Sequence, residues 1–417
     1  MSSLNVAREL WRELDYVYSV LSIARDVRTY VTGLFREANT PAKHAHLMVA
    51  FLSGVLPVLP DHGRPPDQET DEIAADLIAL NRAGFLTTDS QPASPNKKAF
   101  VCGCVDARWV PALREALLRE GDLCFFFEGD PEREDYVVTR NPEHEGVTTL
   151  GCDPGDRTQF EIFFPHQAFF ATHVFAWVAA KEAGGITPHP AVTVGRILVE
   201  VGAPPLIPSP APSLLPIAVA LHEHVYASNY YLEDDEYEGE DEGDENTAVT
   251  AAVRSLFERA DTTAKFAALN VAFIRGVLPM TPLHRLNLYN DALSDGLVTL
   301  NLAHGFLTMD SHPAETNTKA FVTGMVDSRH CGGLRAALLR EPNLYFYMEG
   351  FTNAPLINNG YPIGLAGNLW CEENDDFNMF PHQEFFHQLT FVWVAAREFG
   401  TQGEHPVIAL VRILQQQ

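Results

Sequence analysis

The chain contains an internal duplication, and this feature constrains its fold more than any other. The stretch Asn81–Phe100, NRAGFLTTDSQPASPNKKAF, returns in close form as NLAHGFLTMDSHPAETNTKAF at Asn301–Phe321. Gly84 falls on Gly305, 221 residues later, and from Phe164 onwards the shift becomes 216 residues. A shift that changes across a single loop is what two copies of one domain produce when one loop differs in length. One fold must therefore account for both halves.

Length and composition favour two soluble domains. The chain has 417 residues, of which 46% are hydrophobic, and this is enough for a core in each domain. Its formal charge of −26 argues against nucleic acid or an anionic membrane as a partner, because both require clustered Lys and Arg. No apolar run is long enough to span a bilayer, and charges occupy the place of a signal peptide's apolar core. We therefore expect an intracellular, cytoplasmic protein.

The chain is expected to divide into four segments. These are an N-terminal helical segment of one or two helices, a first repeat domain, a linker and a second repeat domain, at residues 1–40, 41–202, 203–247 and 248–417.

The linker combines two kinds of sequence. Its first part has six prolines between Pro204 and Pro216, which makes it stiff and extended, and a brief helix is expected over Leu214–Tyr231. Its second part is the acidic run Glu233–Glu245, with ten acidic residues. This run predicts a disordered tether, because it has little apolar surface to bury and its charges repel one another.

Strand and helix patterns alternate within each repeat. In the first repeat the strands are expected at Phe85–Thr87, Lys98–Asp106 and Leu123–Glu128. The helices are expected at Lys43–Pro57, Glu72–Arg82, Pro111–Glu120, Phe164–Gly184 and Ala191–Val201. Gly84 is expected to end its helix in a left-handed conformation. The pattern predicts an α+β fold, with two tandem homologous domains that each contain a small mixed sheet and several helices.

A polar stretch that follows the first strand in both copies provides the candidate ligand-binding residues. They are Thr87, Asp89, Ser90, Gln91 and Lys98 in the first copy and Thr308, Asp310, Ser311 and Lys319 in the second. We expect a turn here, whose Asp and Ser side chains either face a ligand or satisfy backbone groups two residues on. The lysines precede an apolar strand, where they are either solvated or pair with a carboxylate or phosphate. Because His312 replaces Gln91, and Met309 replaces Thr88, the first copy is the stronger candidate.

Patterns typical of metal sites or catalysis are not found in the sequence. The six cysteines share no equivalent position between the copies, which argues against an ancestral disulfide or metal site. His166 and His173 are seven residues apart, whereas a zinc pair on a helix requires a spacing of four. No G-x-S-x-G, P-loop or dinucleotide motif occurs. We therefore expect a protein that is not an enzyme and binds no metal.

The stretch LNRAGFLTTDSQP followed by KAF resembles the C-terminal regulatory domain of eukaryotic methylenetetrahydrofolate reductases, and it is similar to bacterial "GFLTTDSQP" domains of unknown function. Leu113–Arg119 looks like the next helix of that domain, Leu123–Glu128 like its next strand, and Phe164-Pro165 like its step into an aromatic-rich helix. The resemblance covers about 120 residues in each copy. It implies a domain that is not catalytic and binds S-adenosylmethionine, with Ser90 and Ser311 among the ligand contacts. Because the chain contains no flavin-binding barrel, reductase activity is not implied.

Two hypotheses about function follow. The first is a non-enzymatic binding or regulatory protein whose partner is a small molecule, such as S-adenosylmethionine, or another protein. The second is a structural or assembly protein, for example of a large DNA virus particle, in which the duplication builds an intramolecular pseudo-dimer. A polar pocket beside Ser90 would favour the first hypothesis, and large exposed apolar faces would favour the second.

Overall fold

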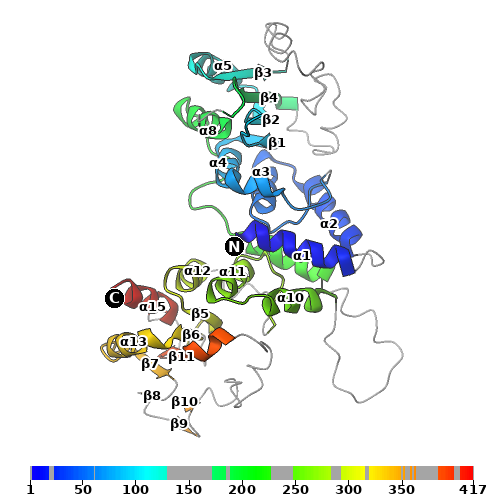
Figure 1. Ribbon diagram of the computed structural model, residues 1–417. Helices are drawn as coiled ribbons and strands as arrows, with labels where there is room; N and C mark the ends of the chain where they lie inside the picture. Colours follow the sequence, from blue (N-terminus) through cyan, green and yellow to red (C-terminus); the bar gives the residue numbers. More distant parts are fainter. Residues whose placement is uncertain are drawn as a thin grey trace. The chain divides into compact units, whose positions relative to one another are not determined.

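The chain divides into two compact units in a computed structural model (Figure 1). The first-repeat unit comprises Ser22–Pro212, and the second-repeat unit comprises Met1–Leu21 together with Ser213–Gln417. The structure describes residues 2–17, 23–60, 62–128, 171–184, 188–226, 248–282, 293–314, 319–348, 351–352, 357–358, 361–362, 384–398 and 404–416.

Nearly the same series of elements follows in the two units. The first-repeat unit contains α2 (Ile23–Glu37), α3 (Pro41–Leu52), α4 (Ala74–Ala83), β1 (Phe85–Gln91), β2 (Phe100–Asp106), α5 (Val110–Arg119), β3 (Leu123–Phe127), β4 (His173–Ala180) and α8 (Pro190–Glu200). The second-repeat unit contains α1 (Ser3–Val17), α9 (Leu215–Leu221), α10 (Ala248–Glu258), α11 (Thr263–Ile274), α12 (Ser294–Ala303), β5 (Leu307–His312), β6 (Phe321–Asp327), α13 (Cys331–Leu338), β7 (Leu344–Met348), β8 (Phe351–Thr352), β9 (Ile357–Asn358), β10 (Tyr361–Pro362), β11 (Leu389–Ala396) and α15 (Pro406–Gln415).

Each unit is built on one main antiparallel sheet, and β9 and β10 of the second-repeat unit pair as a separate antiparallel two-stranded sheet. The strand order is β1-β2-β4-β3 in the first-repeat unit and β5-β6-β11-β7-β8 in the second. Every described strand pair is antiparallel, so the sheets are antiparallel where the sequence prediction had mixed ones. The reason is that α5 connects β2 to β3, which run in the same direction, but β4 lies between them and is antiparallel to both. The same insertion separates β6 from β7.

Helices form a layer on the sheet of each unit. In the first-repeat unit α4 packs on β1, α8 on β2 and β4, and α5 on β3, and in the second-repeat unit α12, α15 and α13 make the equivalent contacts (Figure 1). The junction of helix and sheet is fully buried at Leu80, Phe85 and Leu86, and equally at Leu300 and Phe306. Burial of such side chains is worth about 1.5–3 kcal/mol each, so both units have a core of their own. The predicted α+β fold is confirmed.

Strand β4 corrects the helix that the sequence predicted over Phe164–Gly184. Residues His173–Ala180 are a strand, and Trp177 lies opposite Cys102 of β2 and Phe126 of β3. In a strand that is paired on both sides and covered on both faces, the residues of both faces are apolar. The alternation of polar and apolar residues that identifies a strand in a sequence is then absent. The aromatic-rich run therefore looked like a buried helix. Residues 129–170, which include the start of the predicted helix, lie outside the described part of the chain.

Strand β1 corrects the predicted turn at Asp89–Pro92. Asp89, Ser90 and Gln91 continue the strand and pair with Cys102, Val101 and Phe100 of β2. The register shifts between Thr87 and Asp89, which is a β-bulge at Thr88, and β5 has the same shift at Met309. A bulge adds one residue to a strand and breaks its alternation, so the polar residues after it resemble a turn in the sequence.

The helix pair before the sheet belongs to both repeats. Thr40 and Thr262 are the N-caps of α3 and α11, and their side chains accept hydrogen bonds from the backbone N–H of Lys43 at 3.2 Å and Lys265 at 3.3 Å. The preceding helices α2 and α10 pack against the capped helices. The repeat therefore begins at α2.

The predicted N-terminal segment, residues 1–40, is divided between the two units. Helix α1 packs against α10 and α11 of the second-repeat unit, whereas α2 packs against α3 of the first. Arg259, which directly follows α10, forms ion pairs with Glu13 at 2.8 Å and Glu9 at 3.7 Å. The apolar face of α1 is buried at Leu4, Val6, Ala7, Leu10, Trp11 and Leu14. Helix α1 therefore packs against helices that lie far from it in the sequence.

Two further expectations concern the linker and membranes. The acidic run Glu233–Glu245 lies outside the described residues, so the tether stays a prediction, and so does the intramolecular pseudo-dimer. The described part of the linker contains α9. Among the described helices, none combines the length and the apolar content that crossing a bilayer requires.

Candidate functional site

Thr87 is the first of the candidate residues, and its hydroxyl forms a hydrogen bond to another side chain of the protein. Asn81 of α4 donates hydrogen bonds from Nδ2 to Leu77 O at 2.9 Å and to Thr87 Oγ1 at 2.7 Å. Its Oδ1 accepts a hydrogen bond from Thr87 N at 3.2 Å. Both side chains are buried. This contact, the Asn–Thr clasp, joins the end of α4 to the start of β1.

The second repeat has the same clasp. Asn301 Nδ2 donates to Leu297 O at 2.9 Å and to Thr308 Oγ1 at 2.7 Å, and its Oδ1 accepts from Thr308 N at 3.3 Å. Asn270 of α11 adds bonds to Asn301 Oδ1 at 3.2 Å and to Thr308 O at 2.8 Å. Sequence reasoning missed the two asparagines. The signal for Asn81 and Asn301 was an asparagine after the same apolar leucine near the end of both helices.

Asp89 and Ser90 lie beyond the bulge, where β1 leaves the core. Asp89 is exposed and Ser90 half-buried, in contrast to the three buried residues at the start of the strand. Asp89 Oδ1 accepts a hydrogen bond from Ser90 N at 2.7 Å. Although the residue is exposed, partial desolvation by the surrounding protein raises the pKa of Asp89 above its ordinary value, against the opposing effects of this hydrogen bond and of His62. Because β1 is the edge strand of the sheet, the two side chains lie at its border.

Gln91 and Lys98 close the hairpin between β1 and β2. Gln91 Nε2 donates to Lys98 O at 3.1 Å, and Gln91 O accepts from His189 Nε2 at 3.1 Å. His189 also caps α8, because its Nδ1 accepts from Ala191 N at 3.2 Å. The histidine is thus held as the neutral tautomer with its proton on Nε2. It fixes the end of β1, next to Ser90, to a helix.

The twin of this histidine is His405. Its Nδ1 caps α15 by accepting from Val407 N at 3.1 Å, and its Nε2 donates to His312 O at 3.0 Å. The ring of His312, which replaces Gln91, stacks on Phe321 with 5.8 Å between centroids. Burial lowers the pKa of both His189 and His405 below the ordinary histidine value.

We predict that His405→Ala lowers the free energy of unfolding by about 1–2 kcal/mol, because the variant loses an N-cap and the bond to the strand end. His189→Ala is expected to do the same in the first-repeat unit. The histidine contribution should be complete above about pH 6.5 and decrease as the pH falls, because protonation favours the unfolded chain. Denaturant unfolding at pH 7.5 and pH 5 measures both effects. His387→Ala, at an exposed position, is the control and should change stability by less than about 0.5 kcal/mol.

The remaining candidate residues of the second repeat take part in more interactions within the protein than those of the first. Asp310 N donates to Thr323 Oγ1 at 3.1 Å, and Ser311 also takes part in an interaction. Lys319 Nζ lies 5.0 Å from the centroid of the Tyr345 ring, which is a cation–π distance. In the first repeat no hydrogen bond to the Ser90 hydroxyl occurs within the described ranges, and Lys98 is half-buried. The structure thus places Asp89, Ser90, Gln91 and Lys98 at one end of the β1–β2 hairpin.

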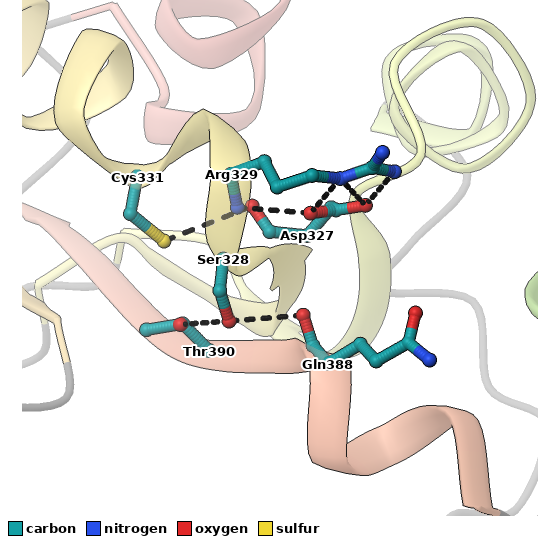
Figure 2. Close-up of polar contacts among 6 residues, drawn as sticks. All are labelled: Asp327, Ser328, Arg329, Cys331, Gln388 and Thr390. Atoms are coloured by element: carbon teal, nitrogen blue, oxygen red, sulfur yellow. Dashed lines mark hydrogen bonds and ion pairs between the residues drawn. The ribbon is translucent and has the colours of Figure 1, made fainter.

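A second polar cluster, which sequence reasoning missed, lies where β6 ends (Figure 2). Arg329 Nε donates to Asp327 Oδ1 at 2.9 Å and Nη2 donates to Oδ2 at 2.5 Å. The guanidinium lowers the pKa of Asp327 to about 2. Ser328 Oγ donates to Gln388 O at 2.9 Å and lies 2.8 Å from Thr390 Oγ1 (Figure 2). These contacts connect the corner after β6, formed by Asp327, Ser328 and Arg329, to the start of β11.

The first repeat has the same corner in Asp106 and Arg108, where Arg108 Nη2 donates to Asp106 Oδ2 at 2.6 Å. The signal in the sequence was an Asp-x-Arg at equivalent places in both copies. Because each arginine neutralises its own aspartate, the corner carries no surplus charge for a ligand, and we interpret it as structural.

Groupings of His, Cys, Asp and Glu that could hold a metal ion do not occur among the described residues. In comparisons with known proteins, a family model described as a domain of unknown function (DUF6919) matches residues 31–166. This match begins within α2 and covers the first repeat through β3. No curated protein matches the chain.

Proposed function

We propose that the protein is a non-enzymatic binding or regulatory protein that holds a small molecule at the end of β1 in its first repeat. The observation that carries the proposal is the position of Asp89 and Ser90. They are consecutive residues of the edge strand, Asp89 exposed and Ser90 half-buried, and they follow a first half of the strand that is buried and clasped. His189 fixes the end of this strand to α8. Polar groups on such a rigid support are suited to binding.

The chemistry of the two side chains limits the ligand. A carboxylate and a hydroxyl on consecutive residues of an edge strand point to opposite faces, so they fit a ligand that reaches around the border of the sheet. Such a ligand would bring a cationic group to Asp89 and hydroxyl groups to Ser90, since charge-assisted hydrogen bonds are the strong ones. S-adenosylmethionine has a sulfonium, an ammonium and ribose hydroxyls, so it is the ligand we propose, in agreement with the resemblance of the sequence around Ser90. Lys98 follows at the same end of the hairpin and is suited to a carboxylate or phosphate.

A thermal-shift screen with S-adenosylmethionine and adenine nucleotides tests the proposal. Ligand at about 100 times its Kd stabilises the folded state by about 2.7 kcal/mol, which raises the melting temperature of a unit of this size by about 5–11 °C. We expect this shift for the parent protein and a loss of it in Ser90→Ala, whose own stability should change by less than about 0.5 kcal/mol.

Ser311→Ala is the matched control and should retain the shift. The opposite result would be equal destabilisation by the two substitutions with no ligand-dependent shift in the parent protein. That outcome would mean that the end of β1 serves the fold alone.

A second candidate function, assembly, is favoured by a different observation. Large apolar side chains are exposed at equivalent positions in both repeats. They are Leu118 (51%) on α5 and Leu339 (53%) directly after α13, and Val192 (40%) and Ile408 (50%) on α8 and α15. These positions are apolar in both repeats, although the side chains are not buried within either unit. If they serve association, sedimentation velocity should show concentration-dependent oligomers that Leu118→Ser and Leu339→Ser weaken. A monomer at all concentrations would exclude this function.

A further inference from the structure

An aromatic ring near the start of β7, in the second-repeat unit, holds two cationic side chains. The Nζ of Lys319 lies 5.0 Å from the centroid of the Tyr345 ring, and the Cζ of Arg397 lies 4.7 Å from the same centroid. Both are cation–π distances. The sum of the two distances limits how far apart the positive groups can be, so one anionic group beside the ring can contact both.

The sheet brings these three residues together from distant parts of the chain. Ala395 of β11 is the register partner of both Phe321 of β6 and Tyr345 of β7. Lys319 precedes Phe321 by two residues. Arg397 follows Ala395 by two residues. Because side chains alternate between the faces of a sheet, this spacing directs both cations to the face on which the tyrosine ring lies.

The guanidinium of Arg397 is oriented by the backbone and keeps donors for a ligand. Its Nε donates to Leu344 O at 3.1 Å. The side chain is exposed, and within the described residues its Nη groups form no hydrogen bond or ion pair. Glu341, four residues before Tyr345, is held instead by Arg412, at 2.9 Å and 3.1 Å. A guanidinium with both Nη groups available can bind an oxyanion through two parallel hydrogen bonds.

The first repeat has the charges of this cluster but not its ring. Lysines occupy both cationic positions there, at Lys98 and Lys181, but Cys124 stands where the second repeat has its tyrosine. Lys181 Nζ donates to Gly121 O. Because a thiol has no π face over which two cations can gather, we expect the site in the second repeat alone.

We propose that Lys319, Tyr345 and Arg397 form a binding site for the phosphate group of a small molecule. A phosphate monoester carries a charge of about −1.5 to −2 at pH 7, which two cations match better than they match the single charge of a carboxylate. The arginine supplies directed hydrogen bonds, and the lysine supplies a second positive charge. This site belongs to the second-repeat unit, whereas the site proposed at Ser90 belongs to the first.

Protection of Arg397 from phenylglyoxal tests the site. The reagent modifies exposed arginines, and peptide mass spectrometry on the full chain measures the rate at each of them. With inorganic phosphate at about ten times the concentration for half protection, and with ionic strength held constant by KCl, modification of Arg397 should slow about tenfold by mass action. Arg275 is the control and should keep its rate, because it is exposed and its side chain forms no hydrogen bond or ion pair within the described residues.

One variant and one further anion make the test specific. Lys319→Gln should raise the phosphate concentration for half protection of Arg397 about two- to fivefold, whereas Lys181→Gln, at the equivalent corner of the first repeat, should leave it unchanged. Should Lys319→Gln not fold, the protection measured in the parent protein decides alone. Acetate at the same concentrations should protect Arg397 less than phosphate does, and equal protection by acetate would contradict the assignment to phosphate. Absence of protection at millimolar phosphate, or equal protection of Arg397 and Arg275, would overturn the proposal.

Discussion

The Gly103→Ala variant is expected to lose the fold of the first-repeat unit. Gly103 lies in β2, where an added Cβ would stand 2.1 Å from Leu86 O and 2.8 Å from the ring of Phe85. The first contact is with backbone of a paired strand, so it cannot be relieved by a side-chain rotation. We expect a loss of at least about 3 kcal/mol of unfolding free energy, beyond the ordinary range for a surface or helix substitution.

The second repeat supplies a replicate of this result, and α2 supplies a control. At Gly324 a Cβ would stand 2.4 Å from both Leu307 O and the Phe306 ring, so Gly324→Ala should be equally damaging to its unit. Gly33, inside α2, has no atom within 4 Å of its added Cβ, and Gly33→Ala should stabilise the helix by about 0.5–1 kcal/mol. Calorimetric melting of the three variants measures these effects. Gly103→Ala melting within 2–3 °C of the parent would contradict the close approach, since about 1 kcal/mol corresponds to that shift.

Removal of the Asn–Thr clasp should have the second largest effect. Asn81→Ala deletes the bonds to Leu77 and Thr87 and leaves the N–H and hydroxyl of Thr87 unsatisfied in the core. We expect a loss of about 2–4 kcal/mol from the missing bonds and the cavity. Asn301→Ala should lose more, because Asn270 also donates to Asn301.

A double-mutant cycle with Thr87→Val separates the clasp from the rest of the substitution. Both residues act in one network, so the combined variant should lose less than the two single variants together, with an interaction energy of about 1–3 kcal/mol. Denaturant midpoints at constant m value provide the numbers. Additive losses would show that Asn81 and Thr87 stabilise the unit independently.

The duplication made most of the fold predictable. Because the same apolar residues recur at one shift, as Phe85 and Phe306 do, any core built in one repeat had to be built in the other. The two sheets indeed share the order of their first four strands. Helix ends were also predictable where local chemistry decides them, as at Gly84, which has a φ of 111° and ends α4 in the left-handed conformation as expected.

The predictions were wrong where contacts between residues far apart in the sequence determine the structure. Trp177 and its neighbours form a strand because β2 and β3 bind it on both sides, and nothing in the local pattern distinguishes such a strand from a buried helix. Helix α1 joins the other repeat through Arg259, which is 246 residues from Glu13. The bulge at Thr88 interrupts the alternation of polar and apolar residues in β1. The sequence therefore indicated a turn at Ser90, where the strand continues.

The ligand site stays a prediction, but the structure shows where its candidate residues lie. Asp89, Ser90, Gln91 and Lys98 do come together, because they belong to one hairpin. The sequence could not show that Thr87 is bound by Asn81, since an amide at a helix end has many possible partners. Nor could it show that His189, 98 residues away, holds the end of the strand.

One calorimetric titration of the full chain with S-adenosylmethionine tests the proposed function most directly. Because Ser311 already takes part in an interaction, whereas the half-buried Ser90 hydroxyl has no hydrogen bond within the described residues, we predict saturable binding of one molecule per chain, absent in Ser90→Ala and retained in Ser311→Ala. No heat of binding up to millimolar ligand, or binding that Ser90→Ala leaves unchanged, would contradict the account.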